Sequence, residues 1–168
     1  MALAGDPPTN QGCSKVKIIF FKKKQINLGE QNVTEWTLLE YKKWFSIKLF
    51  HFHKSDGCQD RFHTHAFGAV SILLKGNYTE EVLEGSQIVS KSRNTSRLTY
   101  IPRDTYHRIT RSTGCYTMLI TGPWSGNFKE LRQRTGDTYQ EWECGEGRAD
   151  LRRTGEWRLL KHKEENEE

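Results

Sequence analysis

The sequence has no hydrophobic run long enough to cross a membrane as a helix. Only 35% of its 168 residues are hydrophobic and the mean hydropathy is −0.79, whereas a membrane helix needs about 18 or more consecutive apolar residues. Cysteine is sparse as well: the four cysteines show no close-pair metal spacing and are few for a secreted disulfide scaffold. The first residues also lack a basic segment followed by an apolar one. We therefore expect reduced thiols, no membrane segment and a cytoplasmic protein.

Strongly basic character is also lacking. The chain has 26 basic and 21 acidic residues, a formal charge of +5 and a pI near 9.0. Residues 22–24 form the only run of three lysines, and such a run is usually a solvated face. Nucleic acid is therefore disfavoured as a partner.

What the chain does have is aromatic residues, at 11%, and short β-branched or aromatic runs separated by glycine, asparagine, aspartate and proline. These runs predict strands at 16–21, 44–53, 62–74, 78–83, 87–90, 97–101, 107–110 and 115–121. The regular recurrence of turn residues predicts antiparallel pairing in an all-β sandwich or barrel. Residues 34–41 fit neither a helical nor a strand period, and both assignments stay open.

The length predicts a single core. We expect residues 1–14 to be a loose arm, 15–160 one domain with its barrel at about 43–122, and 161–168 a charged tail. The charged, glycine-rich part after residue 123 is expected to wrap the β core.

Histidine is the residue type that carries chemistry here. His63 and His65 lie two residues apart in a strand-like run, so alternation puts both on one face. Two such imidazoles can share a metal ion, which needs at least one further ligand. His107 is the candidate, because a hairpin could bring it beside the pair.

At these residues the sequence resembles the cupins. Gly57, His63, His65 and Gly76 match the first cupin motif, and a proline at 102 followed by His107 matches the second. The resemblance covers residues 45–122 and implies a jelly-roll β-barrel, here with irregular flanking segments. It also implies that His63, His65 and His107 bind one divalent metal on the inner wall.

The sequence departs from the cupin pattern where many cupins supply a carboxylate shortly after the histidine pair. That position falls at Ala69 or Val70, neither of which can bind a cation. Glu80 is the candidate replacement, as a fourth ligand or a general base, because Tyr78 and Glu80 share a strand face. The alternative register turns Glu81 inward instead.

Other candidate residues have alternative roles. Tyr78 and Tyr106 are further candidates for a catalytic base. The second pair, His51 and His53, is expected to serve packing or the surface rather than a metal. Cys58 can be a soft ligand or a small buried apolar residue. Residues Trp124 and Phe128 are expected to cap the core.

The resemblance leads to two functional hypotheses. The first is a metal-dependent enzyme acting on a small, anionic molecule, with an Fe²⁺ oxygenase ahead of a sugar isomerase or epimerase that uses Mn²⁺, Zn²⁺ or Ni²⁺. The second is a non-catalytic cupin that captures a small ligand and holds its charge with Arg61, Arg103 or Arg111. Formation of a homodimer is left open.

Overall fold

Antiparallel β-strands form the regular structure of the chain. A computed structural model describes residues 18–57, 61–94, 98–135, 138–144 and 152–158. Within these residues there are thirteen strands and no helix. The strands are β1 (Ile19–Leu28), β2 (Gln31–Tyr41), β3 (Phe45–Phe52), β4 (Arg61–His63), β5 (Ala69–Lys75), β6 (Tyr78–Glu84), β7 (Gln87–Arg93), β8 (Leu98–Ile101), β9 (His107–Ser112), β10 (Cys115–Thr121), β11 (Phe128–Thr135), β12 (Thr138–Cys144) and β13 (Arg152–Arg158).

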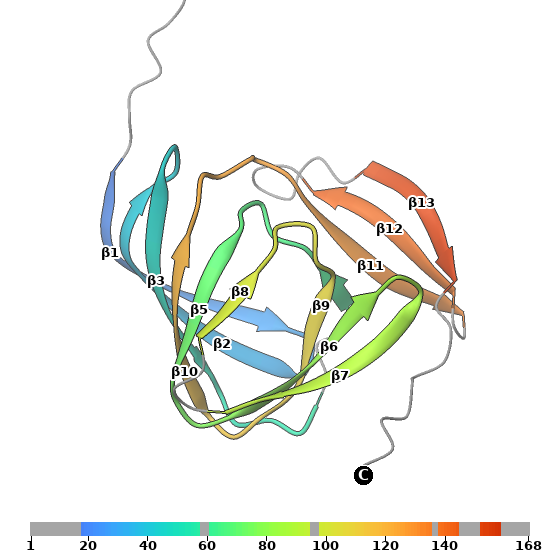
Figure 1. Cartoon of the computed structure of the whole chain (residues 1–168), viewed down its shortest axis with the longest axis horizontal. Coiled ribbons are helices and arrows are strands. Elements are labelled where there is room, and N and C mark those ends of the chain that lie inside the picture. Colours follow the sequence, from blue (N-terminus) through green and yellow to red (C-terminus); the bar gives the residue numbers. More distant parts are fainter. Residues whose placement is uncertain (1–17, 58–60, 95–97, 136–137, 145–151, 159–168) are drawn as a thin grey trace, which may run out of the picture.

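The strands form two sheets that face each other around a central space (Figure 1). The six-stranded sheet has the order β1-β2-β3-β10-β5-β8, and the seven-stranded sheet has the order β13-β12-β11-β4-β9-β6-β7. All the pairings between neighbouring strands are antiparallel. The all-β jelly-roll prediction is thus confirmed. No helix among the described residues is long and apolar enough to cross a membrane.

The segments outside the predicted barrel are strands, and the expectation of irregular flanking segments is corrected. Strands β1 and β2 extend the six-stranded sheet beside β3, and residues 34–41 belong to β2. Strands β11, β12 and β13 extend the seven-stranded sheet beside β4. Pairing of this kind satisfies the backbone groups that the edges of a shorter barrel would expose. The predicted arm at 1–14 and tail at 161–168 lie outside the described residues, and the domain limits stay predictions.

The predicted strand at 62–74 is broken into two. Strand β4 belongs to the seven-stranded sheet and β5 to the six-stranded sheet, so residues 64–68 cross from one layer to the other. The crossing is fixed by backbone hydrogen bonds: the amide of Thr64 donates to the carbonyl of Lys129 at 2.8 Å, and that of His65 donates to Arg103 at 3.1 Å. The apolar run at 62–74, which predicted one strand, therefore comprises two strands and the connection between them.

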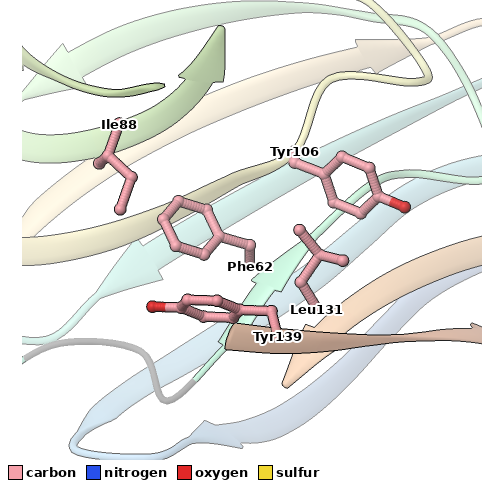
Figure 2. Close-up of a cluster of buried hydrophobic side chains, with 5 residues drawn as sticks. All are labelled: Phe62, Ile88, Tyr106, Leu131 and Tyr139. Atoms are coloured by element: carbon pink, nitrogen blue, oxygen red, sulfur yellow. The ribbon is translucent and has the colours of Figure 1, made fainter. Parts of the chain in front are cut away.

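A cluster of buried side chains packs behind the seven-stranded sheet (Figure 2). Phe62 and Leu131, both fully buried, alternate along their strands with His63 and Glu130, which face the space between the sheets. The cluster therefore lies on the opposite face of this sheet. Its five members come from β4, β7, β11, β12 and the segment before β9: Phe62, Ile88, Leu131, Tyr139 and Tyr106. Since β7 and β12 lie far apart in the strand order, the sheet curls around this cluster.

The turn between β5 and β6 requires glycine. Gly76 has φ +77°, a left-handed conformation that side chains disfavour. A Cβ there would also lie 2.9 Å from the Cα of Cys115. This close approach sets the start of β6, and with it the direction in which the following side chains point.

Candidate metal centre

Three histidines meet on the inner wall of the seven-stranded sheet. One ring nitrogen from each of His63, His65 and His107 lies within 4.8 Å of the others. The ring centroids are 4.9 to 5.1 Å apart, so the rings form a nearly equilateral group. The sequence-predicted triad is therefore brought together in the fold.

The sheet places two of these side chains and the crossing segment places the third. His63 pairs with His107 between β4 and β9, and directly opposed residues on neighbouring strands hold their side chains on the same face. His65 follows the end of β4 and is held by its backbone bond to Arg103. The predicted convergence occurs, but His65 reaches it from the connection between the layers and not from a strand.

A carboxylate fixes the orientation of His107. The Nδ1 of His107 lies 3.1 Å from Oε2 of Glu80, and the other carboxylate oxygen accepts a hydrogen bond from Nε of Arg93 at 2.7 Å. Because a carboxylate accepts and Nδ1–H donates, the lone pair of His107 is left on Nε2. That nitrogen lies 2.8 Å from Nε2 of His65, so a neutral His65 donates its Nε2–H to it.

The charges around the site keep its groups in defined protonation states. Burial alone raises the pKa of Glu80, but the hydrogen bond with His107, the charge of that ring when it is protonated, and the charge of Arg93 outweigh it and hold that pKa below its ordinary value. Burial is also the main reason that the pKa of His65 falls to about 3. The charge of Lys48, and that of His107 when it is protonated, lower it further, and the charge of Glu80 partly opposes them. The site thus combines a neutral imidazole with an ionised carboxylate.

The triad opens into a cavity of about 250 Å³ between the two sheets. Most of its wall is apolar, with aromatic side chains from both sheets and from the segment before β11. Trp124 and Phe128, expected from sequence to cap the core, line it. The indole Nε1–H of Trp124 is buried and has no hydrogen-bond acceptor among the described residues.

Two ion pairs that sequence reasoning missed also line the cavity. Lys48 on β3 donates to Oε1 of Glu35 on β2 at 2.7 Å, and both side chains are almost buried. Arg61 donates to Glu130 at 2.7 Å, beside His63 in the sheet. Alternation along 45–52 and 128–132 could have indicated inward charges, but it does not show which face turns inward.

The predicted tyrosines differ in their placement. Tyr78 lines the cavity, and burial, its largest influence, raises the pKa of its hydroxyl above the ordinary value. Tyr106 belongs to the cluster behind the sheet, where its hydroxyl donates a hydrogen bond to Glu141. Burial and that bond raise its pKa as well. Tyr106 is therefore not brought to the histidines.

The register of β6 favours Glu80 over Glu81 at the site. Glu81 instead accepts a hydrogen bond from Nε of Arg108 at 2.7 Å. Glu80 itself contacts Nδ1 of His107, on the side of the ring away from Nε2. It lies behind the triad, in contact with one of its members.

The remaining candidates lie elsewhere. His51 stacks on Tyr116 at 4.2 Å, and Nε2 of His53 lies 3.0 Å from the hydroxyl of Thr34, which is the packing role expected for this pair. Of the three arginines proposed to hold an anion, only Arg61 lines the cavity. The other two, Arg103 and Arg111, are about half exposed or more and lie beside Asp104 and Asp56. Cys58 lies outside the described residues.

The donor set fits a divalent metal. Three imidazoles suit Fe, Zn, Ni, Cu and similar ions. Two nitrogens that each bind one ion at about 2.1 Å in neighbouring positions are about 3 Å apart, close to the separation between His65 and His107. The carboxylate behind His107 provides the outer-shell hydrogen bond that metal-bound histidines commonly make.

Comparison with known proteins finds distant likenesses of fold. No family model and no curated protein matches the sequence. Similar solved structures include the polyketide cyclase RemF from Streptomyces resistomycificus, which is 14% identical, covers 61% of this chain and 73% of its own, and has a TM-score of 0.48. Oxalate decarboxylase from Bacillus subtilis is 15% identical over 71% of this chain with a TM-score of 0.48. EutQ from Clostridium difficile is 12% identical over 59% of this chain and 75% of its own, with a TM-score of 0.46.

These likenesses concern fold and not activity. The chain spans only 32% of the length of the oxalate decarboxylase chain. The assignment rests on its own features, which are two facing antiparallel sheets and two separated motifs whose histidines meet on the inner wall. By these features the chain is an all-β jelly-roll of two facing sheets, which is the fold that its resemblance to the cupins implies.

Proposed function

We propose that this chain is a cupin and a metal-dependent enzyme that acts on a small anionic molecule. The observation that carries the proposal is the convergence of His63, His65 and His107 at the wall of a cavity large enough for such a molecule. One divalent ion held by the three imidazoles would have positions left for a ligand and would polarise it. A cytoplasmic site of action is part of this proposal.

The charge of the cavity favours an anionic ligand. The cations Lys48 and Arg61 are each paired with a carboxylate, and Glu80 is paired with Arg93. The charges that line or adjoin the cavity are thus largely balanced, and neutral imidazoles would add none to offset a divalent ion. A bound anion supplies the missing negative charge.

Among the reaction classes, the geometry favours the Fe²⁺ oxygenase over an isomerase or epimerase. An isomerase needs a protein group that removes and returns a proton. The candidates nearest the triad are engaged or poorly suited: Glu80 accepts bonds from His107 and Arg93, and Tyr78 has a raised pKa. With Fe²⁺ the site could support oxygen chemistry that needs less from protein acids and bases.

The chain's own residues would then bind, orient and shield the substrate. The triad and Glu80 hold the metal side of the cavity in place, while apolar side chains such as Phe50 and Leu119 exclude water from the opposite wall. Capture of a ligand without turnover is the second candidate function, because the same engaged acid–base groups would suit it.

Metal analysis tests the site. The full chain, purified without chelators and loaded in turn with Fe²⁺ under anaerobic conditions, Mn²⁺ and Zn²⁺, should hold one ion per chain. His63→Ala and His107→Ala should lose it, while His51→Ala on β3 and His53→Ala just after it, as matched controls, should retain it. Circular dichroism confirms that each variant folds. Equal metal content in all variants would refute the site.

A second measurement tests the activity. Fe²⁺-loaded protein is screened for oxygen uptake with a panel of small hydroxy- and keto-carboxylates, alongside thermal melting with the same compounds. Uptake that depends on one compound supports the oxygenase. A rise in melting temperature without chemical change to the compound supports ligand capture instead. Turnover with Mn²⁺ or Zn²⁺ and no need for oxygen would contradict both.

A further inference from the structure

The outer face of the six-stranded sheet is apolar across its whole width. Register fixes two rows of outward side chains, each running from β1 to β8 through every strand of the sheet. The first row is Phe20, Leu39, Ile47, Ile120, Val70 and Tyr100. The second is Lys23, Trp36, Leu49, Met118, Ile72 and Leu98. Eleven of these twelve residues are apolar or aromatic, and we call the two rows the outer apolar face.

Nothing in the described part of the chain covers this face. Phe20, Leu98 and Tyr100 are 64%, 66% and 65% exposed, and Ile120 near the middle is 39% exposed. The remaining members are partly exposed and none is buried. Single exposed apolar residues are ordinary, but a continuous patch of this kind marks an interaction site.

The inner face of the same strands has the opposite character. The residues that alternate with the two rows include five buried polar ones, namely Ser46, Lys48, Ser71, Thr117 and Thr121. An antiparallel sheet with one solvent-exposed face normally turns its apolar side chains inward and its polar side chains to water. Lys48, Ser71 and Thr117 line the cavity, which accounts for their inward position, whereas the outward apolar residues need a partner.

The dimensions of the face match a protein interface. Further aromatic side chains flank the two rows. Tyr41 and Phe45 lie on one side, and His51 and Tyr116 lie on the other. Six strands about 4.8 Å apart and the two rows about 6.8 Å apart cover on the order of 400 Å², and the flanking residues add about 200 Å². The total of about 600 Å² lies at the lower end of what a stable interface buries on each partner.

We propose that the outer apolar face binds a second copy of this chain, with the two six-stranded sheets packed face to face. Face-to-face packing of two apolar sheet surfaces is the arrangement of a β-sandwich, and a two-fold dimer uses one self-complementary patch on both copies. A different protein of complementary charge is disfavoured because the two rows carry a single charge, Lys23, which lies over the Trp36 ring on the strand pair at the sheet edge. Charge at the rim of an interface is tolerated.

The dimer leaves the cavity as it is. The rows point away from the space between the sheets, since the cavity is lined by the alternate residues of these strands, such as Lys48 and Leu119. The inference therefore stands apart from the metal proposal, and either one can fail without the other.

The mass of the full chain in solution tests the proposal. Sedimentation velocity and light scattering between about 1 and 100 µM, over which mass action shifts the proportion of dimer, should give twice the 19.6 kDa of one chain at the upper end. Ile120→Lys places a charge near the centre of the face on both copies and should raise the dimer dissociation constant about a hundredfold or more. The control is Ser92→Lys, on the exposed side of β7 in the other sheet, which should leave the mass unchanged.

A second variant guards against misfolding. Leu98→Lys combined with Tyr100→Lys alters side chains that are about two-thirds exposed in the single chain, so it should fold and still weaken the dimer. A wild-type chain that stays monomeric at the highest concentration overturns the proposal, whether the face is then bare or covered by another segment of the chain. A dimer that persists in both lysine variants overturns it too, because the copies would then meet elsewhere.

Discussion

His107 and Glu80 form one hydrogen-bonded unit, with Nδ1 of the imidazole 3.1 Å from Oε2 of the carboxylate. The two residues come from paired strands, and a shift of register between Thr79 and Glu80 sets Glu80 opposite Ile109 and Val82 opposite His107. Glu80 is 4% exposed and cannot readily find water as an alternative partner. Its role is therefore tied to His107.

If Glu80 orients His107, its removal should weaken metal binding without abolishing it. Glu80→Gln keeps one oxygen to accept from Nδ1–H but presents an amide donor toward Arg93, and an outer-shell change of this kind costs about 10- to 100-fold in metal affinity. Competition with a chromophoric chelator measures the affinity. Glu84→Gln, an exposed position on the same strand, should bind metal as the wild type does. A complete loss of metal in the folded Glu80→Gln variant would mean that Glu80 is itself a ligand.

The buried pair of Lys48 and Glu35 should contribute strongly to the conformation of the cavity wall. Lys48→Met leaves Glu35 and Glu40 buried without their cation, which should cost about 3–5 kcal/mol of unfolding free energy. The double variant Lys48→Met, Glu35→Gln should recover part of that loss. Urea denaturation measures both, and equal stability of the single and double variants would mean that the two charges are not coupled.

The cluster behind the seven-stranded sheet should be a main source of stability. Leu131→Ala removes a fully buried side chain that packs against Phe62 and should cost about 2–5 kcal/mol. Leu131→Met nearly conserves the volume and should cost less than about 1.5 kcal/mol. Denaturant midpoints compare the two variants. Similar losses would show that the site tolerates a cavity.

Cys115 should make stability fall in alkaline solution. The thiol is fully buried, and burial raises its pKa, with a smaller opposing effect from its contact with Ser112. In the unfolded chain a cysteine ionises near pH 8.5, so its contribution is complete below about pH 8.5 and is lost as pH rises toward the folded pKa. Thermal melts of wild type and Cys115→Ala should therefore show a shallower alkaline slope for the variant. Parallel slopes would contradict this.

Much of the fold followed from local patterns, and so did the triad. Short turn-bounded runs predicted strands at 78–83 and 115–121, which correspond to β6 and β10, because alternation and turn chemistry are properties of neighbouring residues. The histidine motifs identified His63, His65 and His107 because their spacing is itself the signal. A strand was predicted at 16–21 and residues 34–41 were left open, whereas the strands after residue 123 were missed, since β11 pairs with β4 across a long stretch of sequence.

The rest of the site depends on register, which one sequence does not fix. Glu80 and Glu81 both lie on β6 and both end almost buried, and only the pairing with β9 decides which meets His107. Glu130 lines the cavity because β11 pairs with β4. This pairing brings it beside Arg61, although the two residues are 69 positions apart in the sequence. Such residues place a charge toward the cavity, but no sequence motif marks them.

The crossing of the chain from His63 in β4 to Ala69 in β5 links the two layers near the candidate site. His63 and His107 belong to the seven-stranded sheet, while His65 lies in the connecting segment that leads into the six-stranded sheet. An ion held by all three would therefore cross-link the seven-stranded sheet to the segment that leads into the six-stranded sheet. Such a cross-link would restrain separation of the two layers at the point where the chain passes between them.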